Sequence, residues 1–177
     1  MILRGRLESP SMKRVLLMSD THVPSRAARL PPWVDDLLPE VDHVVHAGDF
    51  DSPEAYDRID ERASDLTAVR GNTDPYSLSL PRVATLDVEG IRFVVTHGDG
   101  PTHSYRDRVA ETAAANAEGE TVGVSGHTHA IHDERVDGIR LLNPGSASGA
   151  SPARRQTVLL VEVDGEDVTV TRRERER

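Results

Sequence analysis

Seven side chains able to bind a divalent metal ion recur along this 177-residue chain, in most cases just after a short apolar stretch. They are Asp20, His22, Asp49, Asn72, His97, His127 and His129. Carboxylate and amide oxygens and neutral imidazole nitrogens suit Mn, Fe, Co, Ni and Zn with little discrimination. Any one of these residues alone is more often a helix cap, a surface residue or a packed histidine. The prediction of a metal site therefore rests on the ordered set.

The spacing of these residues indicates how a fold brings them together. The apolar stretches predict strands at residues 15–18, 43–47, 66–69, 91–96 and 121–125. A helical pattern covers residues 31–38, and a helix capped by Ser52 begins at Pro53. From His22 to His127, successive groups of ligands lie 23 to 30 residues apart, about one strand-to-strand unit. Since parallel strands present their carboxyl ends at one edge of a sheet, we expect the ligands to meet there.

The remaining patterns complete the predicted fold. They indicate a hairpin of residues 81–87 and 91–96, a helix over 105–116, a turn and a strand within 135–142, and a hairpin of 157–163 and 167–173. We predict an N-terminal extension at residues 1–12, one α/β domain over 13–172 and a frayed tail at 173–177. Met12 could be the biological start, and an ordered edge segment at 1–11 is the alternative.

Composition narrows the class of protein. The chain has no cysteine, so a metal must be held by nitrogen and oxygen. The formal net charge of -9 argues against general nucleic-acid binding. No apolar run approaches the roughly 20 residues needed to span a membrane, and no signal peptide is visible, so we expect a cytoplasmic protein. Lys13 is the only lysine, which favours a halophilic, high-salt habitat over the alternative of a GC-rich coding sequence.

Seven ligands exceed the four that a tetrahedral zinc ion takes. They suit two ions with five or six ligands each that share a bridging carboxylate. Two such ions can clamp the attacking and leaving oxygens of a phosphoryl transfer. A single-metal hydrolase would leave several ligands unused, although spacing alone does not exclude it.

The ordered motifs resemble those of the calcineurin-like metallophosphoesterase superfamily, and its compact single-domain bacterial and archaeal phosphodiesterase branch in particular. The similarity covers about residues 13–165 and is carried by Asp20-x-His22, Gly48-Asp49, Gly71-Asn72-x-Asp74, His97-Gly98, Gly126-His127-Thr128-His129 and Asn143-Pro144-Gly145-Ser146. The resemblance implies a four-layer α/β sandwich, with two mixed β-sheets packed together and helices on the outside. It also favours a homo-oligomer.

The resemblance further implies the chemistry. The substrate would be a small phosphate ester, with phosphodiesters expected and phosphomonoesters as an open addition. A metal-bridging hydroxide would attack phosphorus in line, and Asp49, Asn72 and His97 would be the catalytic residues. One ion would be held by Asp20, His22, Asp49 and His129, and the other by Asp49, Asn72, His97 and His127. Manganese, nickel, iron, cobalt and zinc all fit these ligands. Asp74 would support the ligands without binding a metal ion itself.

One position departs from the wider superfamily. Many members carry a histidine where this chain has Thr73, which leaves the general acid unassigned and favours leaving groups of low pKa. His103 could substitute, although a plain loop histidine is the preferred interpretation. We expect structural roles for His43 and His46 and a surface position for His132. Arg26 and Arg29 could hold phosphate, but solvated arginines are the simpler interpretation.

Other functions fit parts of the pattern. A protein-binding scaffold with the same fold and little or no catalysis is the main alternative, because the membrane-coat retromer subunit resembling this family has a degraded metal site. A nuclease or nucleotide hydrolase fits less well. That branch usually carries the histidine that is replaced by Thr73 in this chain, and it also carries extra domains. Completeness of the ligand set separates the enzyme from the scaffold, and all seven positions carry ligating side chains.

Overall fold

Two mixed five-stranded β-sheets form the centre of the protein. The computed structural model describes residues 11–177, so most of the N-terminal extension expected at 1–12 lies outside the described residues. The first sheet has the strand order β10-β9-β1-β2-β3 and the second β4-β5-β6-β8-β7. The strands are β1 (Lys13–Met18), β2 (His43–His46), β3 (Leu66–Ala68), β4 (Val83–Val88), β5 (Ile91–Thr96), β6 (Glu120–Val124), β7 (Ile131–Val136), β8 (Ile139–Pro144), β9 (Arg155–Asp164) and β10 (Asp167–Glu176).

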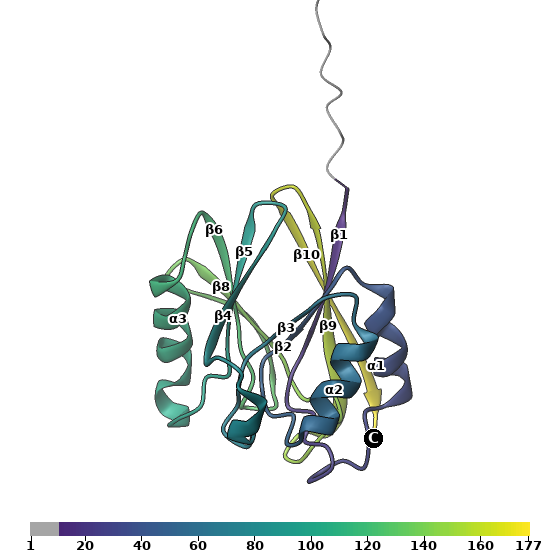
Figure 1. The fold of residues 1–177 in the computed structure, drawn as a ribbon. Coiled ribbons are helices and arrows are strands. Elements are labelled where there is room, and N and C mark those ends of the chain that lie inside the picture. Colours follow the sequence, from purple (N-terminus) through teal and green to yellow (C-terminus); the bar gives the residue numbers. More distant parts are fainter. Residues whose placement is uncertain (1–10) are drawn as a thin grey trace, which may run out of the picture.

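Helices cover the outer faces of the two sheets (Figure 1). The helices α1 (Pro32–Leu37) and α2 (Pro53–Arg62) lie on the first sheet, and α3 (Tyr105–Ala115) lies on the second. Three 3-10 turns, η1 (Leu38–Glu40), η2 (Tyr76–Leu78) and η3 (Thr102–Ser104), sit in the connections. This arrangement confirms the predicted four-layer α/β sandwich. Within residues 11–177, no helix combines the length and apolarity needed to cross a membrane.

Strand β1 shows why a continuous apolar run was needed. Val15 and Leu17 pack between the two sheets, whereas Leu16 and Met18 point to the layer of α1 and α2. All four side chains are fully buried. Successive side chains of a strand point to opposite faces, so a strand covered on both sides must be apolar at every position. Each such buried side chain stabilises the fold by about 1.5–3 kcal/mol relative to an exposed one.

The parallel strands fix the position of the predicted ligands. In the first sheet β1 runs parallel to β2, and β2 to β3; in the second, β5 runs parallel to β6, and β6 to β8. The loops at the carboxyl ends of β1, β2, β3, β5 and β6 carry all seven predicted ligands. The predicted ligands therefore come from the carboxyl edges of two sheets, whereas the spacing predicts the edge of one sheet.

Helix α2 begins as the sequence predicts, and its first residues tie two site loops together. Ser52 Oγ accepts a hydrogen bond from the backbone N–H of Ala55 at 3.1 Å, and Pro53 is the first helical residue. The same hydroxyl donates to the carbonyl of Val23 at 2.9 Å. The loop after β1 is thereby fastened to the loop after β2.

Two expectations about the C-terminal half were wrong. Residues 131–136 form a strand, β7, which pairs with β8 about a turn at Asp137 and Gly138, where only a turn and one strand were expected. Strand β10 also continues through Glu176 instead of fraying from residue 173. It pairs with β9 over its whole length, and Arg155 forms an ion pair with Glu174 at 2.7 Å. The charged tail carries no strand pattern because all side chains from Arg173 to Glu176 are exposed.

Burial of His46 at the end of β2 gives the fold a pH dependence. This ring is fully buried and stacks on Phe50 with centroids 3.6 Å apart. Burial lowers the pKa of His46 from 6.5 to about 3. Between about pH 6.5 and pH 3, His46 is therefore protonated in the unfolded chain and neutral in the folded chain. The free energy of unfolding accordingly decreases as the pH falls through this range.

We predict that His46→Asn reduces the acid sensitivity of folding. Between pH 6 and 4, the free energy of unfolding of the metal-free wild type should fall more steeply than that of the variant, by up to about 1.4 kcal/mol per pH unit. Denaturant unfolding across this pH range measures both slopes. Above pH 7 the two proteins should differ by a constant amount, which reports lost packing. Equal slopes in both proteins would contradict the prediction.

Candidate metal centre

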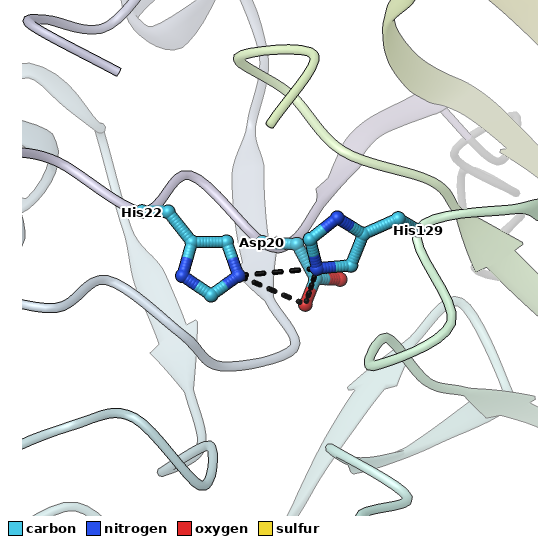
Figure 2. Close-up of side chains that lie close together, drawn as sticks. All are labelled: Asp20, His22 and His129. Atoms are coloured by element: carbon cyan, nitrogen blue, oxygen red, sulfur yellow. Dashed lines mark hydrogen bonds and ion pairs between the residues drawn. The ribbon is translucent and has the colours of Figure 1, made fainter. Parts of the chain in front are cut away.

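The first group of predicted ligands joins the loop after β1 to the loop after β6 (Figure 2). Asp20 and His22 come from the former and His129 from the latter. The Nε2 atoms of His22 and His129 lie 3.1 Å apart, and Asp20 Oδ1 lies 3.3 Å from His129 Nε2 and 3.8 Å from His22 Nε2. All three residues are buried.

The hydrogen bonds behind these rings define which nitrogens face each other. His129 Nδ1 lies 2.9 Å from the carbonyl of Ala150, and His22 Nδ1 lies 3.0 Å from the carboxylate of Asp51. Both partners only accept, so each Nδ1 carries the proton and each Nε2 presents a lone pair. Two lone pairs and a carboxylate oxygen then face one small space. Such a set repels itself unless a cation or extra protons lie between its members, so the residues fit a divalent ion.

A second group lies on the other side of Asp49. His97 Nε2 lies 2.9 Å from Asn72 Oδ1, and His127 Nδ1 lies 3.0 Å from the same oxygen. His97 Nδ1 donates to the carbonyl of Ala47 at 2.7 Å, so its Nε2 faces Asn72 and Asp49. This set again gathers possible metal-ligating atoms around one point.

Asp49 connects the two groups through one oxygen. Its Oδ2 lies 3.5 Å from His22 Nε2 and 3.2 Å from His97 Nε2. The other oxygen accepts a hydrogen bond from the backbone N–H of Thr73 at 2.9 Å. Burial would raise the pKa of Asp49, but the hydrogen bonds from His97 and Thr73 outweigh it and hold the pKa well below its usual range. The carboxylate is therefore ionised and faces both groups.

The imidazoles show how much negative charge the centre holds. Burial lowers the pKa of His97, but the hydrogen bond to Asp49 and the charge of Asp20 outweigh it and raise the pKa to about 9. The pKa of His129 is raised in the same way, against burial, by its hydrogen bond to Asp20. Both shifts reflect the negative charge of the nearby carboxylates Asp20 and Asp49, which also favours a bound cation.

Strained backbone accompanies the predicted ligands. Five of the seven have positive φ angles, at 48° to 71°, which is uncommon for residues other than glycine. They are Asp20, His22, Asp49, His127 and His129. Such strain persists only where the surroundings impose it, and it gathers at functional sites. Close backbone contact adds to the constraint, because a Cβ atom on Gly71 would collide with the side chain of Asp49.

Asp74 holds the loops without joining either group. Its carboxylate accepts hydrogen bonds from the backbone N–H groups of Asp49, Phe50, Asp51 and Gly71 at 2.6 to 2.9 Å. The loops after β2 and β3 are thus fixed to each other. The sequence predicts that Asp74 supports the ligands without binding metal itself, and its contacts to the backbone of these loops are of that kind.

Asn143 and Tyr105 hold the turn that carries His127 and His129. Asn143 Nδ2 donates to the carbonyl of Gly126 at 2.8 Å, and the hydroxyl of Tyr105 donates to that carbonyl at 2.7 Å. Burial raises the pKa of Tyr105 to about 12, which keeps the hydroxyl protonated. Asn143 belongs to a motif that carries the family resemblance, and the structure places it at the end of β8. Tyr105 was not predicted, because nothing in a lone tyrosine at a helix start indicates a contact twenty-one residues away.

The other candidate residues lie outside the two groups. His103 is exposed in η3, and His43 lies 2.9 Å from Asp65 at the start of β2. His132 is half-buried in β7. Arg26 is exposed and donates to the carbonyl of Ser151 at 3.0 Å. Arg29 lines a cavity beside α1 and α2 that none of the seven predicted ligands lines.

Comparisons with known proteins identify the family of the chain. Residues 12–166 match the calcineurin-like phosphoesterase superfamily domain. A probable metallophosphoesterase of Methanothermobacter thermautotrophicus is 32% identical over 155 residues, which cover 85% of this chain and 86% of that protein.

Solved structures of one further protein share the fold. A single mutant of Vps29 from Entamoeba histolytica has a TM-score of 0.75 at 24% identity, over 93% of this chain and 99% of that one. Wild-type Vps29 of the same organism, complexed with Zn²⁺, has a TM-score of 0.72 at 23% identity, over 92% and 98%. At these identities the similarity shows the fold alone. The family match and the archaeal relative place the chain itself in the calcineurin-like phosphoesterase superfamily.

Proposed function

We propose that this protein is a dinuclear metal-dependent phosphodiesterase. The observation that carries the proposal is the convergence of seven metal-ligating side chains in two groups that share the oxygen Asp49 Oδ2. One ion would be held by Asp20, His22, Asp49 and His129, and the other by Asp49, Asn72, His97 and His127. When bound, divalent ions supply Lewis acidity at the phosphoryl oxygens and lower the pKa of water.

The charge of the ligand set fits an anionic ester. Only Asp20 and Asp49 among the seven ligands are carboxylates, since Asn72 and the imidazoles bind as neutral groups. Two carboxylates leave a pair of divalent ions with a net positive charge, which favours a bound phosphate ester. A diester carries one negative charge, and a monoester carries up to two, so both classes are compatible with the site.

The described residues offer no well-placed acid for the leaving group. Position 73, where a histidine could have served, holds a threonine whose hydroxyl donates to Asp51. His103 is exposed in η3. The departing oxygen would therefore leave without a proton placed by a histidine, which favours esters of acidic alcohols.

A protein-binding role is the second candidate. It is supported by the fold shared with Vps29, whose full name is vacuolar protein sorting 29. The complete ligand set favours the enzyme, because a scaffold has no need of seven converging donors under backbone strain. Turnover and metal content separate the two.

We predict that the purified protein binds two divalent ions per chain and hydrolyses bis-(p-nitrophenyl) phosphate. Protein prepared without chelator is loaded in turn with Mn²⁺, Ni²⁺, Co²⁺, Fe²⁺ and Zn²⁺. Metal is then counted by plasma mass spectrometry, and turnover is followed at the absorbance of p-nitrophenolate. Chelator should abolish turnover, and added metal should restore it. Less than one ion per chain after reconstitution, together with no turnover, would contradict the proposal.

We predict that Asp49→Asn lowers turnover by at least about 10³-fold, because the loss of one shared carboxylate weakens both sites and the charge stabilisation they supply. Metal counts should fall for both ions together. Asp87→Asn is the matched control, since Asp87 is exposed and pairs with the half-buried Arg92 near the turn of the β4–β5 hairpin. Activity that survived Asp49→Asn would refute the shared role of this oxygen.

We predict a steep dependence of turnover on the leaving group. Across a series of aryl and alkyl phosphodiesters, kcat should fall as the pKa of the departing alcohol rises, because no placed acid protonates it. A plot of log kcat against that pKa measures the slope. A slope near zero, with chemistry shown to be rate-limiting, would reveal an acid that the contacts of Thr73 and His103 do not indicate.

A further inference from the structure

Asp51 lies behind His22 and takes no place among the ligands. Both of its carboxylate oxygens lie 3.0 Å from His22 Nδ1. The two side chains are 1% and 8% exposed, so little water competes for this contact. The ring of His22 is therefore held between Asp51 on one side and Asp20 and His129 on the other.

Side chains from two neighbouring loops hold the carboxylate of Asp51 in place. The hydroxyls of Ser25, in the loop after β1, and Thr73, in the loop after β3, both donate to it. Its own backbone N–H donates to Asp74 at 2.9 Å, and its φ angle is +79°. Every polar neighbour of the carboxylate is thus a donor. The simplest state of His22 is then the tautomer with the proton on Nδ1 and the lone pair on Nε2.

The other imidazoles are held differently. The Nδ1 atoms of His97 and His129 face the backbone carbonyls of Ala47 and Ala150. Among the four predicted histidine ligands in residues 11–177, His22 alone has a carboxylate behind its ring. A carboxylate fixes the ring orientation and also increases the basicity of the ligating nitrogen more than a neutral carbonyl does.

We propose that Asp51 is a positioning residue for the first metal site, the one formed by Asp20, His22, Asp49 and His129. It orients His22, fixes its tautomer and strengthens its bond to the metal, while Thr73 and Ser25 orient Asp51. This inference rests on the proposed role of His22 as a ligand. It gives the threonine at position 73 a task in metal binding, in place of a task in proton transfer.

The test is metal binding by Asp51→Asn. Asparagine tolerates positive φ as aspartate does, so the backbone is preserved while the charge is removed. Metal-free protein is titrated with Co²⁺ and followed by calorimetry and absorption. We expect one of the two binding steps to weaken about 10- to 100-fold, the other step to stay within a few fold, and the unfolding midpoint of the metal-free protein to stay close to the wild type.

Two further variants complete the test, one with a smaller expected effect and one as a control. Thr73→Val removes only a hydroxyl that orients Asp51, so it should weaken the same step by a smaller factor. Asp65→Asn is the matched control, because Asp65 lies 2.9 Å from Nδ1 of His43, away from the site. Neither binding step should change in that variant.

A second readout follows the tautomer directly. In metal-free protein, ¹⁵N shifts of the His22 ring should show Nδ1 protonated in the wild type and a mixture of tautomers in Asp51→Asn. A purely structural role for Asp51 would lower the unfolding midpoint and leave the tautomer and both binding steps unchanged.

His22→Gln separates the inference from the function on which it rests. If His22→Gln loses one binding step and Asp51→Asn binds as the wild type does, the role of Asp51 is overturned and the dinuclear site stands. If Asp51→Asn weakens both steps equally, the specific role at the first site is overturned. If His22→Gln binds metal as the wild type does, the ligand assignment fails, and the role of Asp51 fails with it.

Discussion

Mutual repulsion among the converging donors is the constraint on which the rest of the structure depends. The Nε2 atoms of His22 and His129 face each other at 3.1 Å, and Asp49 Oδ2 lies within 3.5 Å of rings from both groups. Away from water, such groups repel strongly unless cations or protons lie between them. The raised pKa values of His97 and His129 reflect the same need for positive charge among these groups. A scaffold that holds these groups together must be rigid.

The rigidity comes from the two sheets and from the hydrogen bonds beneath the loops. Three parallel strands in each sheet end at the same edge, above a core of fully buried Val and Leu side chains. The loops that leave this edge carry positive φ angles at five predicted ligands, each of which costs about 1–2 kcal/mol. Asp74 offsets part of this cost by accepting hydrogen bonds from four backbone N–H groups. Asn143 and Tyr105 stabilise the turn after β6 by donating hydrogen bonds to the carbonyl of Gly126.

The same network links stability to the proposed chemistry. Asp49 and Asp51 lie two residues apart in one loop, and Asp74 fixes the backbone of both. One carboxylate would face both metal ions, and the other would act through the ring of His22. Thr73 donates its backbone N–H to the first and its hydroxyl to the second. Thr73 therefore contacts one predicted ligand and the carboxylate behind another, a role that needs no histidine at this position.

The sequence by itself determined the residue types and their order. Buried strands must be apolar, so the strands that precede the seven predicted ligands and the α/β class were readable from local patterns. Tertiary structure decided what depends on contacts between distant segments. Nothing in the sequence distinguishes Asp51 from other acidic loop residues, and only the fold brings its carboxylate to 3.0 Å from His22. Likewise, only the fold brings the hydroxyl of Tyr105 to the carbonyl of Gly126. Strand β7 and the extension of β10 escaped prediction because their polar exposed faces carry little hydrophobic pattern. Local periodicity indicates which side of a helix or strand is buried. Which side chains meet across the site depends on how the two sheets pack, and their strands lie far apart in the chain.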